Sequence, residues 1–323
     1  MSVQVIKFGG SSLRTPEDRQ TVYEKIVQHK KETQHLVVVV SAPGRQGDPY
    51  ATDTLLGLVN KEGAMASLRE LDMIYACGEV ISATMITTLL IDRGYPAISL
   101  NGWQAGLITD DLHFDASVKH IQTDRIKKHL EAGKIVVVAG SQGVSDSGDI
   151  TTLGRGGSDT TAVALAGALS AGKVVIYTDV PGMMTADPKL IPSAKLIPLA
   201  DYDFTRCYAE NGAKVIHAKA IGIAHQFGCK NIHIKPTFST EEGTNLSIQR
   251  QDAIGLAYRE ENDQGVIVFR HRRKGVKEKL SEIIQRHEGW QIRHNQIVLE
   301  FKLPGSQWKS RLEHIHQELI NQL

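Results

Sequence analysis

The segment Thr151–Ala162 (TTLGRGGSDTTA) carries the strongest chemical signal in this chain. Its glycines surround one arginine and are Gly154, Gly156 and Gly157. A glycine-rich turn that leads into a helix presents unpaired backbone N–H groups at the positive end of the helix dipole, which attracts anions. The planar guanidinium of Arg155 is suited to a two-point contact with a carboxylate or a phosphate. The alternative is an ordinary strand-to-helix turn capped by Ser158 or Asp159.

A second glycine-bearing turn follows the apolar segment Val3–Phe8. Lys7 stands near the end of this expected strand, and Gly9 and Gly10 after it allow a ligand to approach the backbone. The segment is not a Walker A loop, because the lysine precedes the glycines and no GK[ST] follows. Phosphate binding and a surface lysine before a turn both remain open at this point.

Short apolar runs alternate with helical segments up to about residue 235. The continuous runs Leu36–Val40 and Ile135–Ala139 are typical of strands buried on both faces of a parallel sheet, and Pro96–Leu100 and Val174–Tyr177 are further strands. This alternation predicts a doubly wound, mostly parallel α/β sheet. Ligands bind at the carboxyl ends of strands in such sheets, so we expect the candidate site along one sheet edge.

The helices between these strands are expected at residues 16–31, at 68–93 with an interruption at residues 77–79, at 119–131 and at 162–171. Glu79 stands in the apolar segment CGEVISATMI, which is an unusual place for a carboxylate. It is either an exposed helical glutamate or a polar group held by a partner.

The amino-acid composition indicates which partners and which cellular compartment to expect. The chain has 323 residues, 41% hydrophobic and 23% charged, with a net charge of +1, so neither a nucleic acid nor a membrane is expected as partner. The three cysteines lack metal-ligand spacing and favour a reduced, cytoplasmic setting without a metal site. The N-terminal residues do not have the pattern of a signal peptide. We expect no apolar run long enough to span a membrane.

The composition shifts beyond Thr244, which predicts two domains, residues 1–245 and 250–323. The second is expected to be a small α+β domain. Its predicted strands are Ala253–Tyr258, Val266–His271, Gln291–Arg293 and Ile297–Leu303, and its helices are Val276–Arg286 and Trp308–Leu323.

Together the loops favour phosphoryl transfer over dinucleotide binding, because no GxGxxG follows the first strand. Lys7, Arg155 and Lys214 supply positive charge, while Asp159 and Asp179 can orient groups or hold a cation. Phosphoryl transfer depends mainly on positioning and charge neutralisation. Mg²⁺ is expected with the nucleotide, since it binds through few carboxylates and the phosphate oxygens.

Six segments in order resemble the aspartate kinase family, of the amino acid kinase superfamily. They are Lys7–Ser12, Ser41–Arg45, Cys77–Ser82, Thr151–Ala162, Tyr177–Pro188 and Gly212–Ile221. They cover roughly residues 3–245, and GDPYATDTLLGL resembles the Bacillus-type enzymes in particular.

The resemblance implies a role for each matched position. The catalytic residues would be Lys7, Asp159 and Lys214. The aspartate substrate would be held by Ser41, Thr52, Glu79, Arg155 and Ser158, with Arg155 on a substrate carboxylate. The nucleotide would be held by Lys7, Gly9, Gly10, Gly156, Gly157, Thr178, Asp179, Met184, Thr185, Asp187, Pro188, Lys189 and Lys214.

The resemblance therefore implies an enzyme that uses ATP and Mg²⁺ to phosphorylate L-aspartate to 4-phospho-L-aspartate, toward lysine, threonine, methionine and diaminopimelate. A kinase of the same fold with another acceptor, or a weakly active regulatory homologue, is the alternative. Met184, Lys189 and Ala218 depart from the usual family residues.

The tail after residue 250 resembles one degenerate ACT unit. Basic residues in the stretch His271–Val276 (HRRKGV) replace its effector-binding turn. We expect a homodimer through this tail and no control by lysine or threonine.

Overall fold

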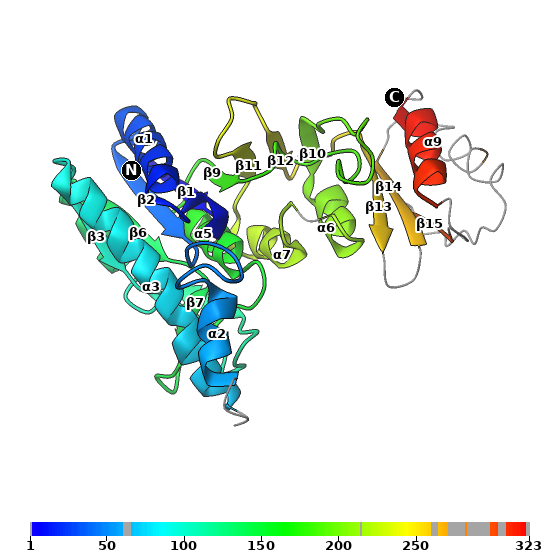
Figure 1. Ribbon diagram of the computed structural model, residues 1–323. Coiled ribbons are helices and arrows are strands. Elements are labelled where there is room, and N and C mark those ends of the chain that lie inside the picture. The colour runs from blue at the N-terminus through cyan, green and yellow to red at the C-terminus, as the bar shows by residue number, and fades with distance from the viewer. Residues whose placement is uncertain are drawn as a thin grey trace. The chain divides into compact units, whose positions relative to one another are not determined.

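The computed structural model describes residues 2–60, 66–213, 215–259, 264–270, 282, 298–302 and 308–320. The chain forms two compact units (Figure 1). Unit 1 contains Met1–Val180 and Lys219–Thr240, and unit 2 contains Pro181–Ala218 and Glu241–Leu323. The domain boundary expected between residues 245 and 250 stays a prediction.

Unit 1 is built on parallel strands in the order β11-β9-β1-β2-β6-β3. They are β1 (Val3–Phe8), β2 (His35–Val40), β3 (Ala97–Leu100), β6 (Ile135–Ala139), β9 (Val174–Thr178) and β11 (Asn231–Pro236). The parallel α/β architecture expected from the apolar runs is confirmed.

The strand register brings the glycine-bearing loops to one edge. Phe8 pairs with Val40 and with Tyr177, and Val40 pairs with Ala139. The carboxyl ends of β1, β2, β6 and β9 are therefore level with one another. The turns that follow these four strands emerge side by side, as the alternation predicted.

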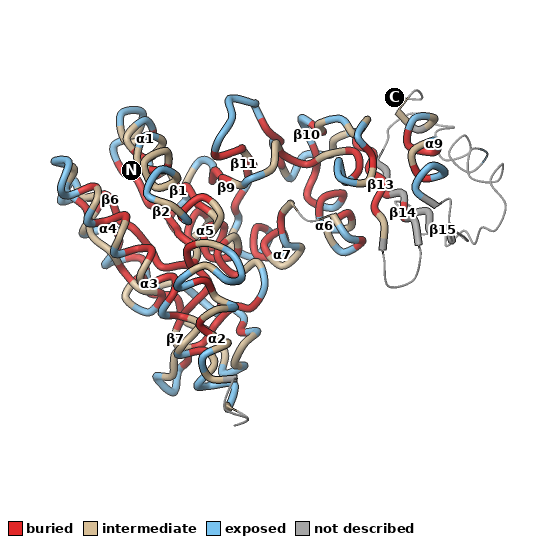
Figure 2. The backbone as a smooth tube through the Cα atoms, in the orientation of Figure 1, coloured by how far each residue is buried: buried red, intermediate tan, exposed pale blue. Residues whose placement is uncertain are grey.

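Helices cover both faces of this sheet, whose buried strands are drawn in red in Figure 2. α1 (Pro16–Glu32), which starts at a capping box formed by Thr15 and Asp18, and α3 (Leu68–Asp92) pack on one face. α5 (Gly157–Ala168) contacts β1, β2 and β9 from the other side. The remaining helical elements of this region are η1 (Gly10–Ser12), α2 (Thr52–Asn60), α4 (Asp124–Glu131) and α7 (Ala218–Phe227).

The predicted interruption of the helix at residues 77–79 is wrong, because α3 continues through them. A Cβ on Gly78 would lie 2.7 Å from the Ala42 Cβ and 2.9 Å from the Tyr50 carbonyl oxygen. This glycine therefore serves a close contact between the helix and the neighbouring loop, and it does not break the helix.

Helix α3 is also long and apolar enough to cross a membrane by length and hydropathy alone, contrary to the expectation from the sequence. Of its most apolar 18-residue window, 44% is buried within the protein. It contacts β3, β6 and β8 (Ile150–Thr152), so packing in the core accounts for its composition.

The predicted helix over residues 119–131 is also wrong in its first part. Val118–Ile121 forms strand β5, and α4 begins at Asp124. The strand belongs to a second sheet of order β5-β4-β7-β8, with β4 (Leu107–Thr109), β7 (Gln142–Ser145) and β8 (Ile150–Thr152). The apolar residues of Val118–Ile121 fit a helical period as well as a short strand. The pairing of this segment with β4 selects the strand.

In unit 2, β10 (Leu199–Asp201) pairs in parallel with β12 (Thr244–Ser247), and Asp201 caps α6 (Tyr202–Glu210). An antiparallel sheet contains β13 (Ala253–Arg259), β14 (Gln264–Arg270) and β15 (Val298–Lys302), and α9 (Trp308–Ile320) follows. The predicted strand at 291–293 and the helix at 276–286, apart from Glu282, lie outside the described residues.

Candidate active site

A cavity of about 290 Å³ opens among the loops that follow β1, β2 and β6. Its lining residues are Lys7, Gly9, Gly10, Ser41, Ala42, Gly44, Thr52, Tyr75, Glu79, Ser141, Gly156, Gly157, Ser158 and Asp159. Ten of these fourteen were predicted as site residues, so the fold brings together positions that are up to 152 residues apart in the sequence.

A largely buried ion pair contributes to the lining of this cavity. Lys7 Nζ, from the end of β1, is 2.6 Å from Asp159 Oδ1, in the first turn of α5. The side chains are only 11% and 13% exposed. The contact is an ion pair at short distance. An ammonium group has three N–H donors, so the lysine keeps at least two of them for a ligand.

The start of α5 is open. The prediction that Ser158 or Asp159 caps this helix is wrong, because both lie within it and the cap residue is Gly156 in a left-handed conformation, with φ of 72°. No side chain caps the helix start. A Cβ on Gly157 would lie 2.1 Å from Ser141 Oγ, so only glycine allows the turn to pack there. An uncapped helix start that lines a cavity favours an anion.

Glu79, which belongs to α3, is a buried residue of the same cavity lining. Burial raises the pKa of its carboxyl from 4.5 to about 8, opposed by hydrogen bonds from the backbone amides of Glu79 and Ala42. Its Oε2 has no hydrogen-bond partner among the described residues. A buried carboxyl with an open acceptor suits a ligand that brings positive charge and N–H donors, such as an ammonium group.

This raised pKa makes the stability of the protein depend on pH. The carboxyl binds its proton more tightly in the folded state, so Glu79 costs no stability below about pH 4.5, and the cost grows as the pH rises toward 8. We expect Glu79→Gln to match the wild-type melting temperature at pH 4 and to exceed it at pH 8.5. The gain at pH 8.5 is on the order of 5 kcal/mol, the cost of a pKa raised from 4.5 to about 8. Thermal unfolding of both proteins across this pH range measures it, and a difference that does not vary with pH would contradict it.

Some predicted residues lie outside the cavity lining. Arg155 is exposed, and among the described residues its guanidinium has no hydrogen bond or ion pair. Asp179 forms an ion pair with Arg45, and Thr178 Oγ1 donates a hydrogen bond to Asp179. Lys214 lies outside the described residues.

The remaining nucleotide positions belong to unit 2 and lie in the loop before β10. Thr185 is buried, and its hydroxyl contacts the Lys195 amide at 2.8 Å and His316 Nε2 at 2.8 Å. The Met184 carbonyl accepts from the Tyr208 hydroxyl at 3.1 Å. Asp187, Pro188 and Lys189 are exposed. A nucleotide contact from this loop stays a prediction.

Sequence reasoning missed four lining residues: Ala42, Gly44, Tyr75 and Ser141. The Ser141 hydroxyl donates to the Tyr75 hydroxyl at 3.2 Å. Burial, with the Glu79 charge as a smaller cause, raises the pKa of Tyr75 to about 12. Tyr75 stands four residues before Glu79 on one helix face, so an uninterrupted helix would have predicted it.

No group of three histidine, cysteine, aspartate or glutamate side chains is placed to hold a metal in the part of the chain that the structure describes. Cys77, Cys207 and Cys229 are thiols that form no disulfide with one another.

The chain belongs to the amino acid kinase family, whose sequence profile matches residues 2–236. Within that family it is similar to the aspartokinases. It is 42% identical to aspartokinase 1 of Bacillus subtilis strain 168 over 79% of this chain and 63% of that protein. The aspartokinase of Geobacillus stearothermophilus is also 42% identical, over 76% of this chain and 58% of the relative.

A solved aspartate kinase from Synechocystis superposes with a TM-score of 0.67 at 34% identity, over 97% of this chain and 54% of that one. The chain thus spans about 60% of the length of the curated relatives that it matches.

Proposed function

We propose that this protein is an ATP-dependent aspartate kinase, which phosphorylates the side-chain carboxylate of L-aspartate to give 4-phospho-L-aspartate. One observation carries the proposal: a single cavity joins the Lys7–Asp159 pair at an open helix start to the buried Glu79 carboxyl. The first half suits phosphate groups, and the second suits the ammonium group of an amino acid.

The phosphates of ATP would lie at Gly9, Gly10 and the start of α5. The Lys7 ammonium would neutralise charge as it develops on the transferred group, which is the main requirement of phosphoryl transfer. Asp159 would hold that ammonium in place from the first turn of α5. The position of a Cβ on Gly9 is 3.6 Å from Lys7 Nζ, so the absence of a side chain keeps this approach open.

The acceptor would occupy the other half of the cavity. Glu79 would pair with its ammonium group, and Ser41, Thr52 and Ser158 offer hydroxyl groups in the same lining. The guanidinium of Arg155, one residue before Gly156, has no partner in the described part of the chain and would bind a carboxylate at two points.

Mg²⁺ would accompany the nucleotide. Bound to ATP it supplies charge neutralisation on the phosphate oxygens, and Mg²⁺ usually needs few protein carboxylates beside them. Among the described residues, Asp159 is the carboxylate that both lines the cavity and lies beside Lys7. This carboxylate thus fits a Mg²⁺ ion that arrives bound to ATP.

The relatives support this assignment. The B. subtilis and G. stearothermophilus proteins are aspartokinases. Escherichia coli aspartokinase III, solved in complex with aspartate and ADP, shares the fold with a TM-score of 0.66 at 22% identity, over 94% of this chain and 80% of that chain. We place the protein in the cytoplasm, in keeping with three cysteines in thiol form.

An ADP-release assay across a panel of acceptors tests the proposal. L-Aspartate should stimulate ADP release strongly over L-glutamate, N-acetylglutamate, carbamate and UMP. Equal stimulation by another acceptor would contradict the assignment of L-aspartate as the substrate. No stimulation by any acceptor would favour a regulatory homologue.

We also propose a homodimer through the tail. The sheet order β13-β14-β15 leaves one edge of β15 without a neighbouring strand in the parts of the chain that are described. An open strand edge readily pairs with a second copy, and two-fold dimers are the commonest assembly. Light scattering of the full chain should give twice the mass of one chain, and the mass of one chain at all concentrations would contradict the dimer.

A further inference from the structure

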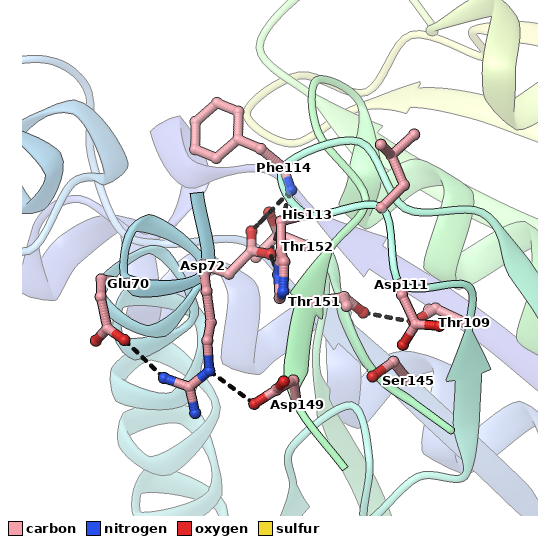
Figure 3. Close-up of polar contacts among 12 residues, drawn as sticks. Glu70, Asp72, Thr109, Asp111, His113, Phe114, Ser145, Asp149, Thr151 and Thr152 are labelled. Carbon is pink, nitrogen blue, oxygen red and sulfur yellow. Dashed lines mark hydrogen bonds and ion pairs between the residues drawn. The ribbon is translucent and has the colours of Figure 1, made fainter. Parts of the chain in front are cut away.

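A fully buried carboxylate that the proposed chemistry does not use lies two turns before Glu79 in α3. Asp72 Oδ2 accepts from His113 Nδ1 at 2.6 Å, and both carboxylate oxygens are 3.2 Å from the Phe114 backbone nitrogen. The Thr152 hydroxyl donates to Oδ1. Figure 3 shows Asp72 between these three groups. Burying a carboxylate is costly, so this one must do more than fill space.

Two of the groups that Asp72 holds belong to residues 110–117, which connect β4 to β5 and are called the buttress loop below. Phe114, in this loop, has a φ of 70°, a conformation that disfavours a bulky side chain. Such strain persists only where the surroundings enforce it, and it is concentrated at functional sites. The strained residue is held by Asp72, because the Phe114 backbone amide donates a hydrogen bond to the Asp72 carboxylate.

The buttress loop supports the acceptor wall of the cavity. The Phe114 ring packs edge-on against the Tyr75 ring, with centroids 6.0 Å apart and planes at 90°. Tyr75 lines the cavity one turn before Glu79. Asp72, Tyr75 and Glu79 lie on one face of α3, so the helix links the buried carboxylate directly to the cavity.

The buttress loop also packs against the turn that carries Arg155. A Cβ on Gly154 would lie 2.9 Å from the Phe114 carbonyl oxygen and 3.1 Å from Asp115 Oδ1. The buttress loop therefore packs so closely on Gly154 that no side chain would fit there.

A lysine ties the two segments together. Lys219 Nζ donates to the Leu153 carbonyl at 3.0 Å, to the Ala116 carbonyl at 2.9 Å and to Asp115 Oδ1 at 2.9 Å. The first of these lies in the turn, and the other two lie in the buttress loop. One ammonium group therefore fixes the spacing between them.

We propose that Asp72 is a positioning residue for acceptor binding, because it holds the buttress loop against Tyr75 and against the turn that presents Arg155. This inference rests on the proposed function for the identity of the acceptor. The arrangement of loop, ring and turn does not depend on that identity.

Asp72→Asn replaces one acceptor oxygen with an NH₂ group, so one of the three donors loses its partner. We expect the KM for L-aspartate to rise between about tenfold and a hundredfold, as for a small misplacement of binding groups. The KM for ATP should stay within about twofold, because the acceptor side alone is displaced. Equal rises in both KM values would overturn the inference.

Asp110→Asn is the matched control. Asp110 lies in the same loop and accepts from the Leu112 and Ser117 amides at 3.3 and 3.0 Å. Its side-chain hydrogen bonds stay within residues 110–117, and its charge also acts on Lys119, which does not line the cavity, so neither KM should change. A rise in the aspartate KM equal to that of Asp72→Asn would show a general effect of loop stability and would overturn the positioning role.

Phe114→Gly keeps the test decisive if Asp72→Asn does not fold. Glycine accepts a φ of 70° without strain, so the melting temperature should change little while the aspartate KM rises. A fall in stability with an unchanged KM would mean that the ring serves folding alone.

Amide hydrogen exchange separates this inference from the proposed function, since it needs no substrate. In Asp72→Asn, the amides of residues 153–157 should exchange at least several-fold faster than in the wild type, and in Asp110→Asn they should not. Unchanged exchange in Asp72→Asn would overturn the buttress, even if the wild type phosphorylates aspartate. Faster exchange in a protein that does not act on aspartate would overturn only the substrate assignment.

Discussion

Asp159→Asn and Lys7→Met should each lower kcat by at least about a hundredfold, the usual loss when one preorganised charge contact to a transition state is removed. Each variant breaks the 2.6 Å pair between β1 and α5. Without Asp159 the Lys7 ammonium loses its fixed position, and without Lys7 the developing phosphoryl charge loses its counter-charge. Initial rates at saturating ATP and aspartate measure the effect, with circular dichroism to verify folding.

The Lys119–Asp146 pair provides the control for these variants. It has a similar distance, 2.8 Å, but its side chains are 43% and 66% exposed. Lys119→Met and Asp146→Asn should leave kcat unchanged, because exposed pairs contribute little. If Lys7→Met or Asp159→Asn kept wild-type turnover while folded, the role given to that residue would be wrong.

Glu79→Gln should raise the dissociation constant for L-aspartate by about a hundredfold, because an ammonium group loses its counter-charge in a buried site. The affinity for ATP should not change. In the wild type, aspartate binding must ionise a carboxyl whose pKa is about 8 in the free protein. Affinity should therefore rise with pH up to about 8 and level off above it.

Calorimetric titration at several pH values checks this second expectation. Binding near pH 7 should release a proton, seen as a dependence of the heat on the ionisation enthalpy of the buffer. Glu79→Gln should abolish this release. An aspartate affinity that is independent of pH between 6 and 9 would contradict the pairing of Glu79 with the ammonium group.

The sheet and most of the cavity were predictable from the sequence. Runs such as Leu36–Val40 are typical of buried strands, and parallel strands put their following turns at one edge. That argument brings Lys7 and Ser41 together without knowledge of any contact, whereas Gly156 follows β8 in the second sheet. The resemblance added the roles of Glu79 and Thr52, which composition and periodicity leave open.

The errors came from signals that tertiary packing overrode. Gly78 suggested a break, but it serves a close contact with Ala42, and this error concealed Tyr75. The cap at Gly156 depends on a left-handed turn, which local polarity at Ser158 does not reveal. Asp72 and His113 are 41 residues apart and carry no local pattern, so only the structure brings them together.

The most direct test of the proposed chemistry is to trap the product. The full chain is incubated with ATP, Mg²⁺ and L-aspartate in the presence of hydroxylamine, which converts an acyl phosphate to a hydroxamate, and the products are identified by mass spectrometry. The cavity that joins Lys7 and Asp159 to Glu79 predicts aspartate β-hydroxamate in an amount equal to the ADP formed. ADP without any hydroxamate, or hydroxamate formed preferentially from L-glutamate, would contradict it.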